Sequence, residues 1–279
     1  MEIALHILVV LMLAYAAICV IYFFFQESFI FVPSFIPDHF RTKVSTPIEE
    51  FKLDTPHKGT IHSILLKAEN PRGLIFYLHG NTGSLKRWQF MAEELCSYGF
   101  DVFAMDYRGY GESEGSRSEA KLHRDVEFCY DFISSKYESQ PIIIYGRSLG
   151  TGFATKLASR RKSDGLVLET PFFSLIDVAK HKLPILPAAA LLRYKLRSDL
   201  YLPHVQCPVH IFHGTKDKIV PHRSAIKLYH KAQGISDIQF TTLVGGRHSN
   251  LNTYPLFRDR LSAFFSSVLL LNSHRAAPR

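Results

Sequence analysis

The sequence predicts an α/β fold with a doubly wound, mostly parallel sheet, and three observations carry that prediction. Apolar runs that suit buried parallel strands recur at residues 73–79, 101–106, 141–146, 164–169, 207–213 and 237–244. Helical patterns lie between these runs, at residues 84–98, 116–137, 149–162, 222–233 and 255–271. Regular alternation of strand and helix is typical of a parallel sheet with right-handed crossover helices.

The N-terminal residues are predicted to form a membrane anchor ahead of this fold. The run from residue 3 to residue 25 carries one His and no formal charge, and as a helix it would span about 30 Å of hydrocarbon. A cleaved signal peptide is disfavoured because the run is too long and a basic n-region is absent. A buried core helix is the other alternative, but so uniform a surface would need protein on every side. We expect an uncleaved anchor over residues 1–26.

The charge balance and the cysteines bear on partners and compartment. The net charge of +8 comes with no dense Lys/Arg run or nucleic-acid motif, so attraction to an anionic membrane surface, or an ordinary solvated surface, is the better interpretation. No Lys or Arg precedes the apolar run, whereas Arg41 and Lys43 follow it, which favours a cytoplasmic main domain. Cys96, Cys129 and Cys207 lie outside the run without a CxxC motif, which agrees with a reducing compartment.

The elements at the start of the main domain follow from local patterns. Residues 48–54 and 60–67 alternate more strongly between apolar and polar side chains than the later runs, which predicts an antiparallel pair at the sheet edge. The helix over residues 84–98 starts at Ser84, a typical N-cap, and stops at Gly99. Its apolar stripe consists of Leu85, Trp88, Met91 and Leu95.

Polar residues and glycine gather directly after the predicted strands, at the edge where α/β sheets bind ligands. The successive segments are HGNTGS, DYRGYGES, GRSLG, ETPF and HGTKDKIVP. The central one, from Gly146 to Gly150, fits the G-x-S-x-G nucleophile elbow, in which a strand turns sharply into a helix. The glycines let the backbone pass closely, and the helix aims free N–H groups at Ser148. Ser148 is therefore the predicted nucleophile.

A serine hydroxyl needs a base and an orienting acid to act as a nucleophile. The order expected with this elbow is Ser, then Asp or Glu, then His. His248 follows the last predicted strand in the loop GGRHSN and is the predicted base. Asp217 in HGTKDKIVP is the favoured acid, and Glu169 at the end of the preceding strand is its rival. His79 and His213 are expected to shape the core or the loops instead.

Two backbone N–H groups are expected to bind the negative oxygen that forms when the serine attacks a carbonyl. One belongs to Leu149, directly after the nucleophile, and the other to Asn81, in the loop after the strand at 73–79. Gly80 permits close backbone approach at that loop. Loss of one such donor typically costs about 3 kcal/mol of transition-state stabilisation.

These segments, together with GGRHSN, resemble in order and spacing the motifs of α/β-hydrolase-fold serine hydrolases, over roughly residues 28–270. More narrowly, the chain resembles the membrane-anchored α/β-hydrolase-domain branch, related to serine aminopeptidase-like and monoacylglycerol-lipase-like proteins. The resemblance implies the same nucleophile, acid, base and oxyanion donors. It also implies a loop that shapes the site by internal pairing and contains Asp106, Arg108, Gly109 and Gly111.

The implied organisation is an anchor over residues 1–26, an α/β-hydrolase domain over residues 27–272 and a tail over residues 273–279. Residues 171–203 form an insert where such proteins keep a cap. It is rich in Leu, Ala and Pro, and five Lys or Arg stand against a single Asp between positions 180 and 204. We interpret it either as a lid that covers an acyl pocket and faces a lipid surface, or as a small cap that only packs on the domain.

The expected activity is hydrolysis of carboxylic ester or thioester bonds in acyl or lipid-like substrates, through an acyl-enzyme on Ser148. A serine peptidase or amidase of the aminopeptidase type and a non-catalytic scaffold are the alternatives on the same fold. The chemistry needs no cofactor and no metal, and no Cys/His cluster has metal-ligand spacing. The expected partners are a lipid or acylated substrate and a membrane, and no nucleic acid.

Overall fold

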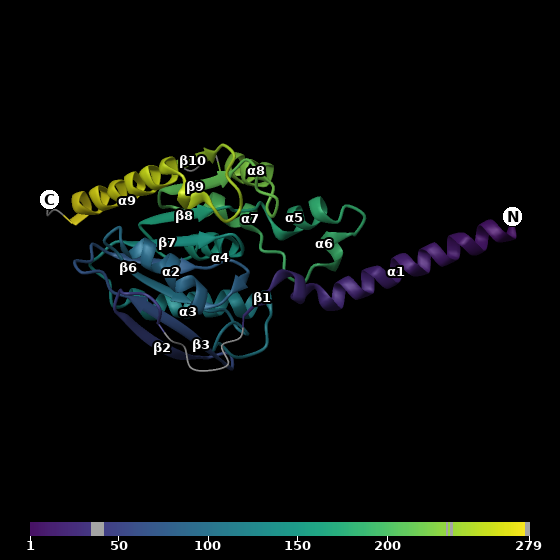
Figure 1. Ribbon diagram of the computed structural model, residues 1–279, viewed down its shortest axis with the longest axis horizontal. Coiled ribbons are helices and arrows are strands. Elements are labelled where there is room, and N and C mark those ends of the chain that lie inside the picture. The colour runs from purple at the N-terminus through teal and green to yellow at the C-terminus, as the bar shows by residue number, and fades with distance from the viewer. Residues whose placement is uncertain (35–41, 233, 235–236, 277–279) are drawn as a thin grey trace.

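The computed structural model describes residues 1–34, 42–232, 234 and 237–276 (Figure 1). Within these residues, one eight-stranded sheet has the order β10-β9-β8-β7-β4-β6-β3-β2. Its strands are β2 Ile48–Thr55, β3 Gly59–Leu66, β4 Leu74–Leu78, β6 Asp101–Met105, β7 Ile142–Arg147, β8 Gly165–Glu169, β9 Val209–Gly214 and β10 Ile238–Leu243. A separate parallel pair joins β1, Val32–Pro33, to β5, Thr82–Gly83.

The strand directions confirm the predicted doubly wound, mostly parallel sheet with an antiparallel edge. β2 and β3 are antiparallel, as are β3 and β6, and the other neighbours in the sheet are parallel. The helices are α1 Glu2–Ile30, α2 Leu85–Cys96, α3 Glu119–Ser134, α4 Leu149–Ala158, α5 Leu175–Lys182, α6 Ala188–Leu191, α7 Ser198–Tyr201, α8 His222–Lys231 and α9 Pro255–Ala276.

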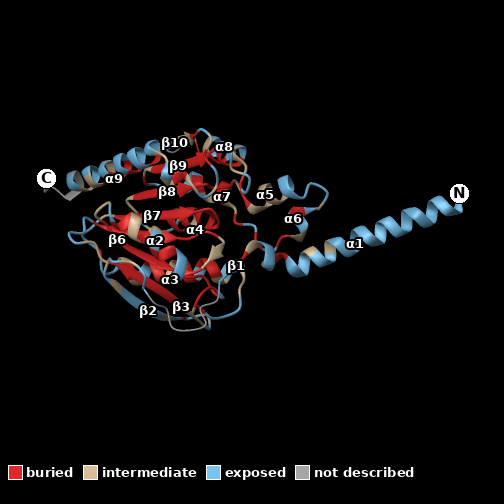
Figure 2. Ribbon diagram, in the orientation of Figure 1, coloured by how far each residue is buried: buried red, intermediate tan, exposed pale blue. Residues whose placement is uncertain are grey.

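Helices cover both faces of the sheet and create two apolar layers. Successive strand residues point to opposite faces, so neighbouring side chains of β4 enter different layers. Phe76 contacts Tyr130 of α3, in the layer that also holds α4 and α8. Tyr77 contacts Trp88 of α2, in the layer that also holds α9. Figure 2 shows the central strands buried between these helices, whose outer faces are exposed.

Helix α2 begins after Ser84 as predicted, but a different side chain satisfies its first turn. The hydroxyl of Ser84 makes no capping bond and lies 3.0 Å from the hydroxyl of Ser34. The carboxylate of Asp106 accepts the Leu85 N–H instead, at 3.0 and 3.1 Å. Because the orphan donors of a helix start need an acceptor, Asp106 fixes α2 to the loop after β6.

Helix α1 continues past the expected anchor boundary at residue 26. It ends at Ile30, and Phe31 is buried against Tyr110 and Tyr194. In the described residues, α1 is the helix whose length and composition would allow it to cross a membrane. Its N-terminal part extends away from the sheet (Figure 1).

Some of the sequence predictions fall on positions outside the described residues. These are Arg41, which entered the charge count after the anchor, and Gln233, at the predicted end of the helix before β10. Residues 277–279 of the predicted tail also lie outside the described residues.

Candidate active site

Ser148 lies at the turn between β7 and α4 in a strained backbone conformation. Its φ is +50° and its ψ is −116°, angles that a residue with a β-carbon rarely adopts and that cost about 1–3 kcal/mol. Two close backbone approaches surround it. A β-carbon on Gly146 would lie 2.6 Å from the Ala154 side chain, and one on Gly150 would lie 2.0 Å from the Leu78 carbonyl oxygen. The glycines of the motif are therefore sterically required.

The three side chains that were expected to cooperate lie in one hydrogen-bonded row. His248 Nε2 lies 2.8 Å from Ser148 Oγ, and His248 Nδ1 lies 2.7 Å from Asp217 Oδ2. Ser148 starts α4, Asp217 follows β9 and His248 follows β10, so the shared carboxyl edge of the parallel strands collects them. The imidazole is 19% exposed, whereas the Asp217 side chain is buried.

Asp217 is held as a carboxylate by several donors. Its Oδ1 accepts the backbone N–H groups of Ile219 and Val220 at 2.8 and 2.9 Å. His213 Nε2 lies 3.3 Å from its Oδ2. Burial alone would raise the pKa of Asp217, but the hydrogen bonds from His213 and His248 outweigh burial and lower that pKa well below its ordinary value. An ionised Asp217 can orient the imidazole and stabilise its protonated form.

The rival acid, Glu169, has other partners. Its Oε2 accepts the hydroxyl of Tyr145 at 2.8 Å, and Arg147 Nε lies 3.4 Å from its Oε1. Its backbone carbonyl accepts the Ser148 N–H at 2.8 Å, so Glu169 supports the elbow through its main chain. Between the two candidates, the hydrogen bond to His248 belongs to Asp217.

The predicted oxyanion donors, Asn81 and Leu149, line the same cavity as Ser148. Leu149 is the first residue of α4, where an N–H has no acceptor within the helix. The Asn81 carbonyl accepts the Val32 N–H at 2.9 Å and the Tyr110 hydroxyl at 2.7 Å. Two donors thus orient the Asn81 residue from behind. Tyr110 was not predicted from the sequence, and its position in DYRGYGES was the signal.

The loop after β6 is held by contacts of its side chains outside the loop, whereas the resemblance implied pairing within it. Arg108 is fully buried and binds Asp125 of α3 through two hydrogen bonds of 2.5 and 2.7 Å. Gly109 and Gly111 adopt positive φ values of +74° and +55°. Asp106 lies 3.1 Å from the buried His79 ring, which stacks on Trp88. His79 therefore contributes to the core behind the loop after β4.

A cavity of about 590 Å³ leads away from Ser148 and has mostly apolar walls. One wall is the insert, which contributes Phe172, Leu175, Val178, Ala179, Lys182, Leu183, Leu186 and Leu192. The other wall belongs to α1, which was expected to serve only as a membrane anchor, so this wall was not predicted. It consists of Ile18, Ile21, Tyr22, Phe29 and Ile30. The signal in the sequence was the pair Gln26 and Glu27, two polar residues at the end of an apolar run.

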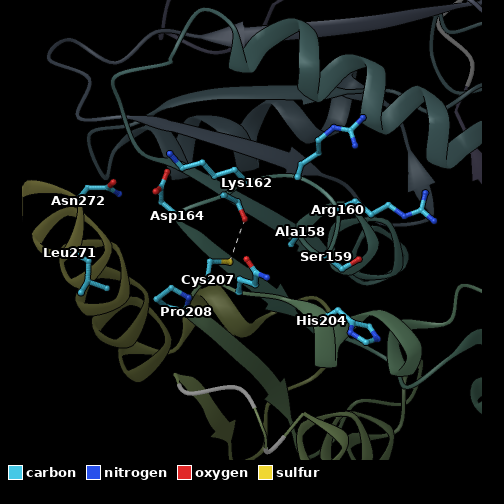
Figure 3. A pocket seen from close by; sticks show the side chains of 13 residues that line it. Ala158, Ser159, Arg160, Lys162, Asp164, His204, Cys207, Pro208, Leu271 and Asn272 are labelled. Carbon is cyan, nitrogen blue, oxygen red and sulfur yellow. Dashed lines mark hydrogen bonds between the residues drawn. The ribbon is translucent and has the colours of Figure 1, made fainter. Parts of the chain in front are cut away.

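A second cavity, of about 490 Å³, lies away from this site (Figure 3). It opens near the amino ends of β8 and β9 and is lined by the end of α4, Asp164, His204 and Pro208. Two of its cations are paired, because Arg161 binds Asp131 and Arg160 lies 3.3 Å from Glu127. The Ser163 hydroxyl and the Cys207 thiol face each other at 3.3 Å inside it (Figure 3).

Among the described residues, one group of side chains has the spacing of metal ligands. Its atoms, from Glu50, His62 and Glu112, lie within 4.8 Å of one another. His62 Nε2 lies 2.9 Å from Glu50 Oε1, and Lys52 Nζ lies 2.7 Å from Glu112 Oε2, so protein groups already contact both carboxylates. The group involves the antiparallel edge strands β2 and β3, separate from the serine site.

A mostly parallel sheet with a strained serine at the turn between β7 and α4 defines an α/β-hydrolase fold. The family model described as serine aminopeptidase, S33, matches residues 69–203, which include Ser148 and end before Asp217. An esterase of Pyrococcus furiosus superposes with a TM-score of 0.71 at 16% identity, over 86% of this chain and 98% of the esterase. The chain thus has the α/β-hydrolase fold and resembles the serine aminopeptidase-like branch over nearly half of its length.

Relatives with longer sequences resemble the chain more closely in sequence. The lysophosphatidylserine lipase ABHD12 of Danio rerio is 34% identical over 68% of this chain and 57% of the lipase. The protein of that name from Xenopus tropicalis is 31% identical over 70% of this chain and 58% of its own length. The chain therefore spans less than two thirds of these relatives.

Proposed function

We propose that this protein is a membrane-anchored serine hydrolase that cleaves carboxylic ester or thioester bonds of single-chain acyl lipids. The observation that carries the proposal is the unbroken row Ser148–His248–Asp217, whose serine lines an apolar cavity. A serine, a base and an orienting acid in hydrogen-bond reach form the arrangement that activates a hydroxyl for attack on a carbonyl.

In the proposed reaction, His248 Nε2 removes the proton of Ser148 as its Oγ attacks the carbonyl carbon. The backbone N–H groups of Asn81 and Leu149 bind the oxyanion, and Asp217 stabilises the imidazolium. His248 then donates the proton to the leaving alcohol or thiol. A water molecule activated by the same imidazole hydrolyses the acyl-enzyme and restores the Ser148 hydroxyl.

The cavity supports an acyl substrate. Its size falls within the range of about 300–1,000 Å³ that is usual for small-molecule sites, and Lys182 is the one charged residue among the side chains that form its described wall. The two ABHD12 relatives, by their name, are lipases of a lysophospholipid. A peptidase that binds a terminal amine would use a carboxylate, and the described cavity wall contains no Asp or Glu.

The location follows from α1 and from the charges near it. We propose that residues 1–26 anchor the chain in a membrane and that residues 27–272 form the hydrolase domain. α1 supports the anchor by its length and apolar surface. The count of Lys and Arg on either side of the apolar run favours a cytoplasmic domain.

A substrate panel tests the proposal. The full-length protein and its Ser148→Ala variant are given p-nitrophenyl esters, palmitoyl thioesters, a lysophospholipid and aminoacyl amides. We expect Ser148-dependent turnover of esters or thioesters. Preferential turnover of the amides would instead support a peptidase, and equal turnover by the Ser148→Ala variant would contradict the hydrolase assignment.

A further inference from the structure

Two polar contacts join helix α1 to the insert, although both elements are largely apolar. The Tyr15 hydroxyl donates to the Ile185 carbonyl at 2.9 Å. Gln26 is completely buried, its Nε2 donates to the Leu191 carbonyl at 3.0 Å, and its Oε1 accepts the Arg193 N–H at 2.7 Å. The insert is therefore attached to the helix at two separate heights.

The spacing of these contacts sets the depth of the insert in a membrane. Tyr15 and Gln26 are eleven residues apart, which is about 16 Å along an α-helix. If the apolar run of α1 crosses a hydrocarbon core of about 30 Å, Gln26 lies at its boundary and Tyr15 near its middle. Figure 1 shows α5 and α6 on the same side of the sheet as α1, with α6 beside the C-terminal part of that helix. Ile185 is then about half a bilayer below the surface.

The chemistry of the segment Leu183–Leu192 suits hydrocarbon. Its sequence, LPILPAAALL, has no charge and lies between Lys182 and Arg193. Ile185 is 78% exposed and Leu183 is 41% exposed, and exposed prolines and alanines of the same segment accompany them, so the exposed apolar residues are grouped rather than scattered. The two prolines carry no N–H, and the N–H groups of Leu186, Ala188, Ala190 and Leu192 donate to carbonyls of the segment itself. Internal pairing of this kind is what a lipid environment demands of a backbone.

The contact at Tyr15 of α1 satisfies a further backbone group of the segment. A backbone carbonyl in hydrocarbon needs a donor, and the hydroxyl of Tyr15 provides one for Ile185. Charged residues lie next to the contact at Gln26. There the guanidinium of Arg193 pairs with Glu27 at 3.0 Å, at the level where lipid headgroups and water would meet the protein. On both α1 and the insert, the change from apolar to charged residues therefore occurs at the same level, the proposed hydrocarbon boundary.

We propose that the segment Leu183–Leu192 is immersed in the bilayer beside α1, and that the cavity between them takes one acyl chain directly from the membrane. Ile18, Ile21 and Ile30 line the cavity over about 18 Å of helix; with Gln26 at the boundary, about 12 Å of that length lies within one leaflet and about 6 Å lies above it. Ser148 lines the same cavity. The ligand is a long, single acyl chain whose ester lies at the interface; its hydrolysis rests on the function proposed above.

The anchor also holds the reaction end of the cavity. Directly after α1, Val32 donates its N–H to the Asn81 carbonyl, and Ser34 donates to the Gly83 carbonyl at 2.8 Å. The strand pair β1–β5 therefore links the helix to the oxyanion loop. Helix α1 would therefore fix the position of the chain-binding cavity and of the oxyanion donor relative to the membrane.

Adjacent tryptophan substitutions in α1 test the cavity. Ile21 lines it, whereas the neighbouring Val20, which is about equally exposed, is not among the lining residues. The full-length protein in phosphatidylcholine nanodiscs is assayed with a palmitoyl lysophospholipid in the bilayer and with dispersed p-nitrophenyl acetate. We expect Ile21→Trp to lower palmitoyl turnover by at least about tenfold more than it lowers acetate turnover, because the indole occupies the space of the long chain. Val20→Trp should change neither.

Equal palmitoyl turnover by Ile21→Trp and Val20→Trp would overturn the proposed entry route, as would hydrolysis of the acetate alone by the unsubstituted protein. Failure of both esters, with no Ser148-dependent turnover, would instead reject the proposed function and leave the depth of the insert to a second measurement. That measurement is quenching of tryptophan fluorescence by lipids brominated near the middle of their acyl chains.

The second measurement places one tryptophan on the insert and one far from it. Ile185→Trp should be quenched strongly, after subtraction of the signal of Trp88, the one natural tryptophan. Leu270→Trp, at a 62% exposed position towards the C-terminal end of α9, should not be quenched; Figure 1 shows that end of α9 opposite α1. An Ile185→Trp signal as weakly quenched as that of Leu270→Trp would show the insert in water and overturn the proposal.

Discussion

Gly150 packs so closely on Leu78 that a β-carbon at position 150 would lie 2.0 Å from the Leu78 carbonyl oxygen. This contact presses the first turn of α4 against the end of β4. The turn that carries Ser148 and the loop that follows β4, which contains the proposed oxyanion donor Asn81, are thereby held next to each other. The glycine in the motif serves this approach as much as the turn itself.

Gly150→Ala is therefore expected to destabilise the protein severely, because the methyl group meets backbone that cannot move aside. Gly152→Ala is a matched control in the same helix, where the nearest atom is the Leu196 side chain at 3.0 Å. We expect a loss of at least about 3 kcal/mol in the free energy of unfolding for Gly150→Ala and about 1 kcal/mol or less for Gly152→Ala. Denaturant unfolding in detergent measures both, and similar losses would contradict the steric explanation.

Asp217→Asn is expected to keep the fold and slow the reaction. The amide can no longer hold the imidazole as a carboxylate does, so kcat should fall by about 10³–10⁴-fold. Glu169→Gln is the control, because the Glu169 carboxylate bonds Tyr145 rather than His248, and its kcat should fall less than about tenfold. Steady-state kinetics measure kcat for both variants. A larger loss of kcat in Glu169→Gln than in Asp217→Asn would assign the role of the orienting acid to Glu169.

Tyr110→Phe tests the placement of the oxyanion donor. The lost hydroxyl orients the Asn81 residue through its carbonyl, so the backbone N–H on the other side should become less well aligned. We expect kcat to fall by about tenfold with KM nearly unchanged, because the oxyanion forms only in the transition state. An increase of KM alone would show that Tyr110 affects substrate binding instead.

The stability of the protein should depend on pH through His210. Burial, with a smaller contribution from Arg260, lowers the pKa of this residue from 6.5 to about 4. Between these values the unfolded chain binds a proton at His210 that the folded chain does not. The contribution of the neutral His210 to stability is therefore complete above about pH 6.5 and is lost as the pH falls towards 4.

His210→Gln checks this dependence, since an amide can still reach the Thr241 hydroxyl, 2.8 Å from the ring in the native protein, but does not titrate. The free energy of unfolding of the variant should vary less between pH 6.5 and pH 4, by on the order of 3 kcal/mol. An unchanged pH profile in urea unfolding would show that other groups cause the acid sensitivity.

The sheet could be predicted from the sequence because a strand buried on both faces must be apolar throughout, as in LIFYL of β4. The functional edge could be predicted for a related reason. Ser148, Asp217 and His248 each follow a recognisable strand, and parallel strands bring their carboxyl ends together. Their positions in the chain, up to 100 residues apart, did not obscure that rule.

Features that depend on distant partners could not be predicted. Ser84 has the residue type of an N-cap, yet the acceptor for its helix comes from Asp106, about twenty positions later. The apolar surface of α1 is equally compatible with lipid on all sides and with a protein wall on one side. The buried Gln26 shows that a protein wall covers one side of α1, because a buried amide needs hydrogen-bond partners and those of Gln26 lie in the insert.

The central claim is that His248 activates the hydroxyl of Ser148, and covalent labelling tests it most directly. The full-length protein is treated with a fluorophosphonate probe, and the modified peptide is identified by mass spectrometry. We predict one label, on Ser148, that is lost in Ser148→Ala and strongly slowed in His248→Ala. Labelling that proceeds at an equal rate in the folded His248→Ala protein, or at a different serine, would contradict the account.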